Sequence, residues 1–291
     1  MADNKRQSIR AAFWMIGTVL SFSAMAVAGR EASHELSSFE IMTYRSLIGM
    51  VVMLGLIVAT GKRHQLRPQS FRLHLVRNIL HFAATNLWFT ALASVPLALV
   101  FAFEFTSPLW TAVLAPLILR EMLPKIRIIA TIIGFIGIMI IARPGIVEFS
   151  PGMIAAASCA IGFAGAAIAT RKLTGLQPVA TILFWMCAIQ SVLGLAIAGA
   201  DLSITLPSSA LLVPILAVSL CGLSAHFCLT KALQIAPATF VMPLDFARLP
   251  AIAVVGFILY GEIIDIFMII GSLFILAANS INIRTGIVRQ A

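Results

Sequence analysis

Four charged side chains stand out within the apolar stretches of this sequence, and they are the residues best placed to do chemistry. They are Arg45, Glu104, Asp245 and Arg248. A charge at the centre of a lipid bilayer costs about 2.5 to 3.5 kcal/mol on insertion scales, so such a residue usually has a partner or a function. Asp245 and Arg248 are three positions apart, a spacing that brings both onto one face of a helix and lets them pair.

Two interpretations of this pair stay open. One is a structural ion pair that tolerates burial. The other is a binding site for a zwitterion, whose ammonium and carboxylate groups exchange partners with Asp245 and Arg248. Polar side chains elsewhere could hydrogen-bond the same substrate or titrate with it, although a lone His or Asn in a membrane helix is at least as often a link between helices. The candidate substrate-binding residues are His81, Asn86, Trp88, Glu104, Ser107, His226, Asp245 and Arg248.

The composition places these residues in a membrane protein. The chain has 291 residues, of which 60% are hydrophobic and 11% are charged, whereas soluble domains carry about 25% charged residues. A formal net charge of +9 would suggest nucleic acid as the partner of a soluble protein, but here the basic residues lie in short segments between apolar stretches. We therefore expect a lipid bilayer around the chain and no nucleic-acid partner.

Motifs for enzyme chemistry are absent from the sequence. It contains no phosphate-binding glycine loop, no His-Glu-x-x-His zinc motif and no Gly-x-Ser-x-Gly nucleophile elbow. The four cysteines fall inside apolar stretches and not at metal-ligand spacings. We expect a chain that is not an enzyme, with no catalytic residue, no metal and no cofactor.

Apolar stretches of about 20 residues, the length that crosses a hydrocarbon core of roughly 30 Å, follow one another along the chain. The first follows basic residues as a secretory leader does, but a similar stretch recurs in the second half of the chain, so we take it as a membrane helix. The fold class is therefore an all-α integral membrane protein with ten transmembrane helices. The predicted spans are 11–29, 38–60, 72–93, 97–119, 126–142, 152–170, 178–199, 209–231, 238–260 and 263–282.

Lys and Arg alternate in number between the two ends of these spans, and this predicts their orientation because basic residues are retained on the cytoplasmic side. Most lie at one end, while the other end carries mainly Arg30 and Arg143. Both termini are therefore predicted to be cytoplasmic, which requires an even number of spans and agrees with ten. The predicted location is the cell inner membrane.

The chain repeats itself when it is shifted by 141 positions. A proline, an acid followed by phenylalanine, and a glutamate recur in the same order, which favours duplication over chance. The halves 1–145 and 146–291 then hold five spans each, and because five is odd the second half enters the membrane from the opposite side, as in the inverted repeats of secondary transporters. The coinciding pairs are Arg30 with Arg171, Ala91 with Ala232, Leu92 with Leu233, Pro96 with Pro237, Val100 with Val241, Glu104 with Asp245, Phe105 with Phe246, and Glu121 with Glu262.

Spans 97–119 and 238–260 both contain interior prolines. Proline removes a backbone hydrogen bond, and helices that are kinked at equivalent positions of two halves indicate a transporter's binding site, although prolines are also common in membrane helices. We predict that these two spans line a cavity. Glu104 and Asp245 each lie about 12 Å along a helix from a proline. Because their helices run in opposite directions, we expect the two acids on opposite sides of the midplane.

A glutamate at a helix end, followed by a glycine-containing helix, occurs once in each half. The residues are Leu119-Arg120-Glu121 and Ile133-Gly134-Phe135-Ile136-Gly137 in the first half, and Tyr260-Gly261-Glu262 and Ile270-Gly271 in the second. On these motifs the whole chain resembles the drug/metabolite transporter superfamily, in its ten-helix EamA-like branch of metabolite exporters and most nearly in the YddG type of amino-acid exporter. The second half departs from the pattern, because residues 273–278 lack the usual second glycine. We expect Glu121 and Glu262 to be structural.

The resemblance and the intramembrane charges together predict a secondary transporter that exports small metabolites by alternating access. Amino acids, aromatic or other apolar ones among them, are the leading class, because Asp245 and Arg248 offer opposite charges in an apolar surrounding. One alternative is a multidrug or cation exporter of the same superfamily, which the lack of an acid in span 11–29 disfavours. The other is an intramembrane enzyme or lipid-handling protein. Proton coupling and the oligomeric state are left open.

Overall fold

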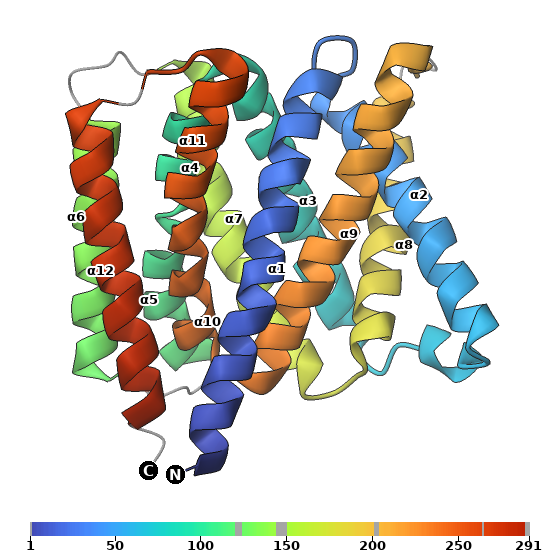
Figure 1. The fold of residues 1–291 in the computed structure, drawn as a ribbon. Coiled ribbons are helices and arrows are strands. Elements are labelled where there is room, and N and C mark those ends of the chain that lie inside the picture. The colour runs from blue at the N-terminus through green and yellow to red at the C-terminus, as the bar shows by residue number, and fades with distance from the viewer. Residues whose placement is uncertain (1, 120–123, 144–149, 201–203, 264, 289–291) are drawn as a thin grey trace.

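The computed structural model describes residues 2–119, 124–143, 150–200, 204–263 and 265–288. Within these ranges the ordered elements are helices and there is no β-strand. The helices pack side by side as a bundle, and α1 begins where α12 ends, at what we call the terminal end (Figure 1). The elements are α1 Ala2–Ala32, α2 Ser38–Ala59, η1 Arg63–Leu66, α3 Phe71–Ser94, α4 Leu97–Glu104, α5 Ser107–Leu119, α6 Lys125–Ala142, α7 Pro151–Thr174, α8 Val179–Ala198, η2 Ser209–Leu211, α9 Leu212–Ile235, α10 Ala238–Leu244, η3 Asp245–Ala247, α11 Arg248–Tyr260 and α12 Ile266–Val288.

Each predicted span overlaps helical structure, although α1 begins well before residue 11, and two spans are broken. Span 97–119 divides into α4 and α5 after Glu104, and span 238–260 divides into α10, η3 and α11 around Asp245. Pro108 explains the first break, because it has no N–H to bond the carbonyl of Glu104 four residues earlier. Pro250 likewise cannot bond the carbonyl of Phe246. The two breaks therefore put the two acids at helix ends.

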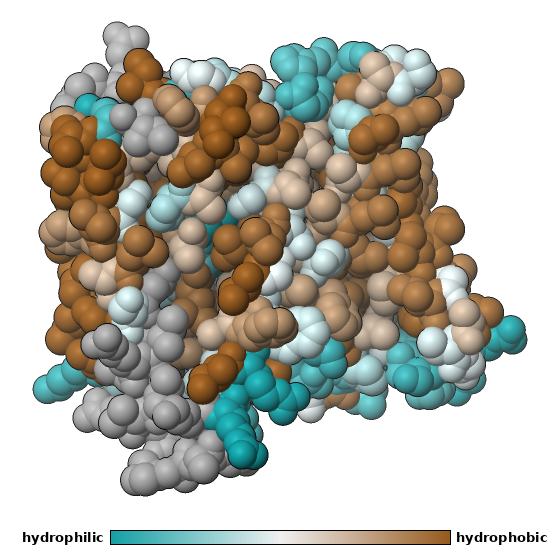
Figure 2. Space-filling view, viewed as in Figure 1, coloured by the Kyte–Doolittle hydropathy of each residue, from teal (hydrophilic) through white to brown (hydrophobic). Residues whose placement is uncertain are grey.

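The outer surface of the bundle is apolar. Figure 2 shows hydrophobic residues over the sides of the molecule, with hydrophilic residues gathered toward its ends. Seven described helical stretches are long and apolar enough to cross a membrane, and shorter apolar stretches, Ile128–Ile141 and Ile266–Ala278, lie in α6 and α12. Large side chains such as Leu117 and Val213 are mostly exposed on this surface. Apolar surface of this extent is stable in contact with lipid and not with water, so the chain is a multi-pass membrane protein.

The most extensive helix contacts join α1 to α9, α3 to α7, α6 to α12 and α2 to α8. Glycines allow the closest approaches. Gly162 of α7 faces Ala84 of α3, and Gly137 of α6 and Gly271 of α12 each lie against the other's backbone carbonyl. The last helix thus packs closely although residues 273–278 lack a glycine, because Gly271 alone provides the contact.

We expect Gly271→Val to destabilise the protein by about 1–3 kcal/mol, because overpacking of a tight contact forces the helices apart. A carbon added at Gly271 would lie 2.5 Å from the carbonyl oxygen of Gly137. Gly55→Val is the matched control, since no atom lies within 4 Å of a carbon added there. Thermal unfolding in detergent measures both variants, and equal melting temperatures would contradict the packing of α6 against α12.

Candidate functional site

A cavity lies between α1, α3, α7, α9 and the two broken helices. The empty space among its lining side chains is about 710 Å³, including any part that is open to the surroundings. Most of its wall is apolar and aromatic, with a few polar groups. The lining residues are Phe22, Met25, Arg77, His81, Thr85, Trp88, Glu104, Phe105, Ser107, Pro108, Phe163, Ala166, Ala167, Thr170, His226, Leu229, Met242, Asp245 and Arg248.

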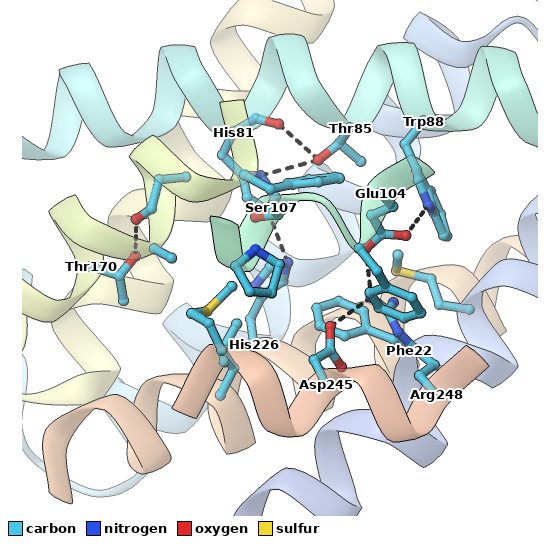
Figure 3. A pocket seen from close by; sticks show the side chains of 18 of the residues that line it. Phe22, His81, Thr85, Trp88, Glu104, Ser107, Thr170, His226, Asp245 and Arg248 are labelled. Carbon is cyan, nitrogen blue, oxygen red and sulfur yellow. Dashed lines mark hydrogen bonds and ion pairs between the residues drawn. The ribbon is translucent and has the colours of Figure 1, made fainter. Parts of the chain in front are cut away.

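Arg248 lies between the two acids of the cavity. Its Nη2 atom donates to Oε1 of Glu104 over 2.5 Å and to Oδ2 of Asp245 over 2.7 Å. Glu104 also accepts from Nε1 of Trp88 over 2.7 Å (Figure 3). The predicted Asp245–Arg248 pair is therefore present. The two acids lie close together, each where its helix breaks, and their placement on opposite sides of the midplane stays a prediction.

Aromatic rings surround the same guanidinium. Its central carbon lies 4.9 Å from the ring centroid of Phe22, 4.8 Å from that of Phe101 and 5.0 Å from that of Phe105. The negative face of an aromatic ring attracts a cation at this distance. Arg248 is only 2% exposed, and a guanidinium does not lose its proton in proteins. Its stability in the bundle therefore depends on the two carboxylates and the rings.

Three buried polar atoms beside the cavity have no hydrogen-bond partner among the described residues. They are Nε of Arg248, Oδ1 of Asp245 and Oγ of Ser107. Buried polar groups in proteins are nearly always paired, so each exception calls for an explanation. Two donors and one carboxylate acceptor on residues that line the same cavity are groups that a bound ligand can satisfy.

A chain of hydrogen bonds runs from the cavity into α8. The Nε2 atoms of His81 and His226 are 3.1 Å apart, and Nδ1 of His81 lies 2.9 Å from Nε2 of Gln190. Because an amide nitrogen can only donate, Nδ1 of His81 accepts and Nε2 of His81 donates to His226. Asn78 accepts from both Gln190 and Arg77. The network therefore connects a buried arginine with two histidines through neutral groups.

Seven of the eight candidate residues line this cavity, and Asn86 is the exception. The cavity face of α3 presents His81, Thr85 and Trp88. Asn86, one residue after Thr85, is rotated about 100° around the helix axis. Its amide nitrogen donates to the carbonyl of Phe82 in its own helix over 2.8 Å. The direction of its side chain on α3 therefore places Asn86 outside the candidate site.

Some lining residues are not recognised from the sequence. Phe22 and Phe163 carry no distinguishing signal in so apolar a chain. Arg77 does carry one, because it is a charge inside predicted span 72–93. It lies near the start of that span, close to Arg67 and Arg72, which are among the basic residues that predict the orientation of the helices. The sequence alone therefore does not distinguish Arg77 as a cavity residue.

Polar contacts join several helices at the end of the bundle opposite the terminal end. Arg30 donates to Oε1 of Glu262 over 2.7 Å, and the backbone N–H of Leu97 donates to the same oxygen over 3.1 Å. Tyr260 donates to Glu31 over 2.9 Å. These contacts tie the end of α1 to α4 and to the end of α11, which agrees with the structural role expected of Glu262.

A recess lies at the terminal end beside the ends of α5, α7 and α9, and its lining includes Arg171, the counterpart of Arg30 in the repeat. Glu121, the counterpart of Glu262, lies outside the described residues. The recess is lined by Leu119, Arg171, Thr174, Gly175 and Gln234.

Comparisons with known proteins decide the family. Residues 9–143 match the model of the EamA-like transporter family. The chain is 30% identical over 260 residues to a riboflavin transporter of Vibrio cholerae, covering 88% of this chain and 87% of that protein. It is 29% identical over 267 residues to an S-adenosylmethionine uptake transporter of Rickettsia bellii, covering 91% and 90%. The chain belongs to the EamA-like transporter family.

As an EamA-like member of the drug/metabolite transporter superfamily, the chain is a membrane transporter of a small molecule and not an enzyme. A solved crystal structure matches it with a TM-score of 0.77 at 18% identity, over 93% of this chain and 95% of that one, which shows a shared fold. The expected family is therefore confirmed, while the likeness to the YddG type stays a prediction.

Replacing Arg248 should destabilise this EamA-like transporter strongly. Arg248→Met leaves Glu104 and Asp245 buried without a counter-charge, and breaking a buried ion pair in this way costs about 3–5 kcal/mol. The triple variant Arg248→Met, Glu104→Gln, Asp245→Asn removes all three charges together, so we expect it to recover much of that loss. Thermal unfolding in detergent compares the two. A triple variant no more stable than the single one would show that the charges do not compensate each other.

Proposed function

We propose that this protein is a secondary transporter that exports small metabolites carrying both an ammonium and a carboxylate group, with amino acids as the first class to test. The free atoms beside the cavity carry this proposal. Nε of Arg248 and Oγ of Ser107 offer donors, and Oδ1 of Asp245 offers a carboxylate acceptor. A zwitterion matches all three, because its carboxylate accepts from the arginine and its ammonium donates to Asp245 in charge-assisted hydrogen bonds.

The aromatic wall favours an apolar or aromatic body on the same substrate. Phe22, Phe105 and Phe163 line the cavity beside the charged groups, and flat rings pack favourably against aromatic side chains. S-adenosylmethionine, the molecule named for the Rickettsia relative, combines an amino-acid group with an aromatic base. It therefore belongs to the same substrate class and to the same test.

A neutral aromatic metabolite is the second candidate, favoured by the name of the riboflavin transporter of Vibrio cholerae and by the aromatic wall. In that case the three charges at Arg248 would serve only to hold the broken helices together. Export of cations is less well supported, because the lining acids Glu104 and Asp245 are balanced by Arg77 and Arg248. The cavity then has no excess of negative charge to attract a cation.

We infer a ten-span arrangement in the inner membrane, with residues 1–145 and 146–291 as inverted repeats. The helix contacts support it, because a shift of 141 positions converts the α1–α9 pair into the α7–α3 pair. The breaks at Glu104 and Asp245 also fall at equivalent positions. Alternating access between the two sides follows from such a repeat. The Arg30–Glu262 contact is consistent with a molecule closed at the end opposite the terminal end.

Counterflow in liposomes tests the substrate class. Liposomes that contain the purified protein are loaded with unlabelled amino acids, S-adenosylmethionine or riboflavin. Exchange with the labelled compound outside is measured with and without a pH gradient. We expect exchange of the first two, reduced at least about tenfold in Asp245→Asn and Arg248→Lys because each variant loses a charge-assisted contact. Arg63→Gln, on an exposed segment, should exchange normally.

Other outcomes of the same measurement are informative. Exchange of riboflavin alone would favour the second candidate, and unchanged exchange in both site variants would contradict the proposed site. Accumulation that follows the pH gradient would identify proton coupling. Comparison of right-side-out with inside-out membrane vesicles reports the direction of transport.

Thiol labelling tests the topology. His34 follows α1 and His64 follows α2, and both are exposed. In a background without cysteine, we expect His34→Cys to react with a membrane-impermeant thiol reagent in intact cells and His64→Cys to react only after permeabilisation, because the two segments lie at opposite ends of α2. Labelling of both from the same side would contradict the arrangement.

A further inference from the structure

Arg45, in α2, is a buried cation with one free edge. It is 4% exposed, and its Nε and Nη2 atoms have no hydrogen-bond partner in the part of the chain that the structure describes. Its remaining nitrogen, Nη1, lies 3.3 Å from Sδ of Met42. A guanidinium keeps its proton, and a buried charge without a counter-charge is strongly unfavourable. The free edge therefore calls for a negative group.

No described acid supplies that group, because each of the buried carboxylates near the middle or the start of α2 is engaged elsewhere. Glu104 and Asp245 both bind Arg248. Glu40, five residues before Arg45, accepts hydrogen bonds at the start of α2 and from the backbone of Thr205.

A second buried cation near Arg45 increases the need for a negative group in this region. Arg77 of α3 is a second buried arginine, 2% exposed, and the partners of its guanidinium are the neutral side chains of Thr170 and Asn78. Arg45 and Arg77 are near enough to act on one another electrostatically. The region between α2, α3 and α8 therefore has a surplus of positive charge within the described residues.

A small pocket lies beside Arg45. Its empty space is about 200 Å³, including any part that is open to the surroundings. Gly222 of α9 leaves room for the guanidinium, because a carbon added there would lie 2.7 Å from Nε of Arg45. The hydroxyl of Ser46 also has no partner among the described residues. The pocket is lined by Arg45, Ser46, Gly49, Met186, Cys187, Gln190, Ser219 and Leu223.

We propose that this pocket binds a monovalent anion, either a carboxylate group or a halide such as chloride. Nε and Nη2 form one edge of the guanidinium, and such an edge matches the two oxygens of a carboxylate or holds a single ion between its two N–H groups. Ser46 provides a further donor. The occupant is either the carboxylate of a transported molecule or a free ion.

The pocket is connected to the cavity through one side chain. Gln190 lines the pocket and its amide nitrogen contacts His81, which lines the cavity. An anion held by Arg45 therefore adjoins the hydrogen-bond network of the two histidines. The site is nevertheless separate from the Arg248 cluster, and a free ion can occupy it whichever substrate the cavity takes.

Thermal unfolding of the purified full-length protein in detergent tests anion binding without transport. Sodium chloride or sodium acetate replaces the salt of a large organic sulfonate at constant ionic strength. We expect the melting temperature to rise with chloride or acetate and to saturate. Arg45→Gln should abolish the saturable rise. Arg45→Lys keeps the charge but loses the two parallel N–H groups of the guanidinium edge, so it should weaken the apparent affinity for the anion about tenfold. Arg63→Gln is the matched control and should behave as wild type.

A second measurement separates the two sources of the anion. If substrate exchange in liposomes requires chloride, the occupant is a free ion. If exchange is independent of chloride and acetate competes with a carboxylate substrate, the occupant is the substrate's own carboxylate. Because binding is measured separately from transport, failure of the proposed function leaves the anion site standing. The absence of any saturable rise in wild type, or an equal rise in a cooperatively unfolding Arg45→Gln, would overturn the proposal.

Discussion

A guanidinium keeps its charge where water is excluded, and the centre of this bundle is arranged around that constraint. Arg248 is neutralised by one carboxylate from each half of the chain, Glu104 and Asp245. Glu104 reaches it from the break between α4 and α5, and Asp245 lies three residues before it in the chain. The three aromatic rings around the same group complete its surroundings. The helix breaks, the buried carboxylates and the aromatic wall therefore all help to stabilise one buried guanidinium.

The spacing of residues in the sequence predicted the positions of the helices and one of the two ion pairs of Arg248. The positions of the helices followed from the lengths of the apolar stretches, and the Asp245–Arg248 pair followed from a separation of three residues. The contact between Glu104 and Arg248 did not, because it joins residues 144 positions apart and depends on how two helices break. Asn86 was misplaced for a simpler reason, since one residue changes the direction of a side chain on a helix by about 100°.

The arginines show a different limit. Arg45 is recognisable in the sequence as an intramembrane charge, but its lack of an acidic partner is a property of the packed bundle. Arg77 resembles an orientation charge until its burial is known. Relatives of similar identity bear the names of different substrates, riboflavin and S-adenosylmethionine. The fold shared by these proteins therefore does not determine the substrate.

The glycine contacts have a mechanical consequence. Helices that touch backbone to backbone, as α6 and α12 do at Gly137 and Gly271, resist separation and behave as one rigid unit. Compliance is then concentrated where the helical hydrogen bonds are interrupted, at residues 105–106 and around Asp245. Arg248 bridges these two joints, and the rings of Phe105 and Phe246 also meet between them, so a strain applied at either joint is transmitted to the other.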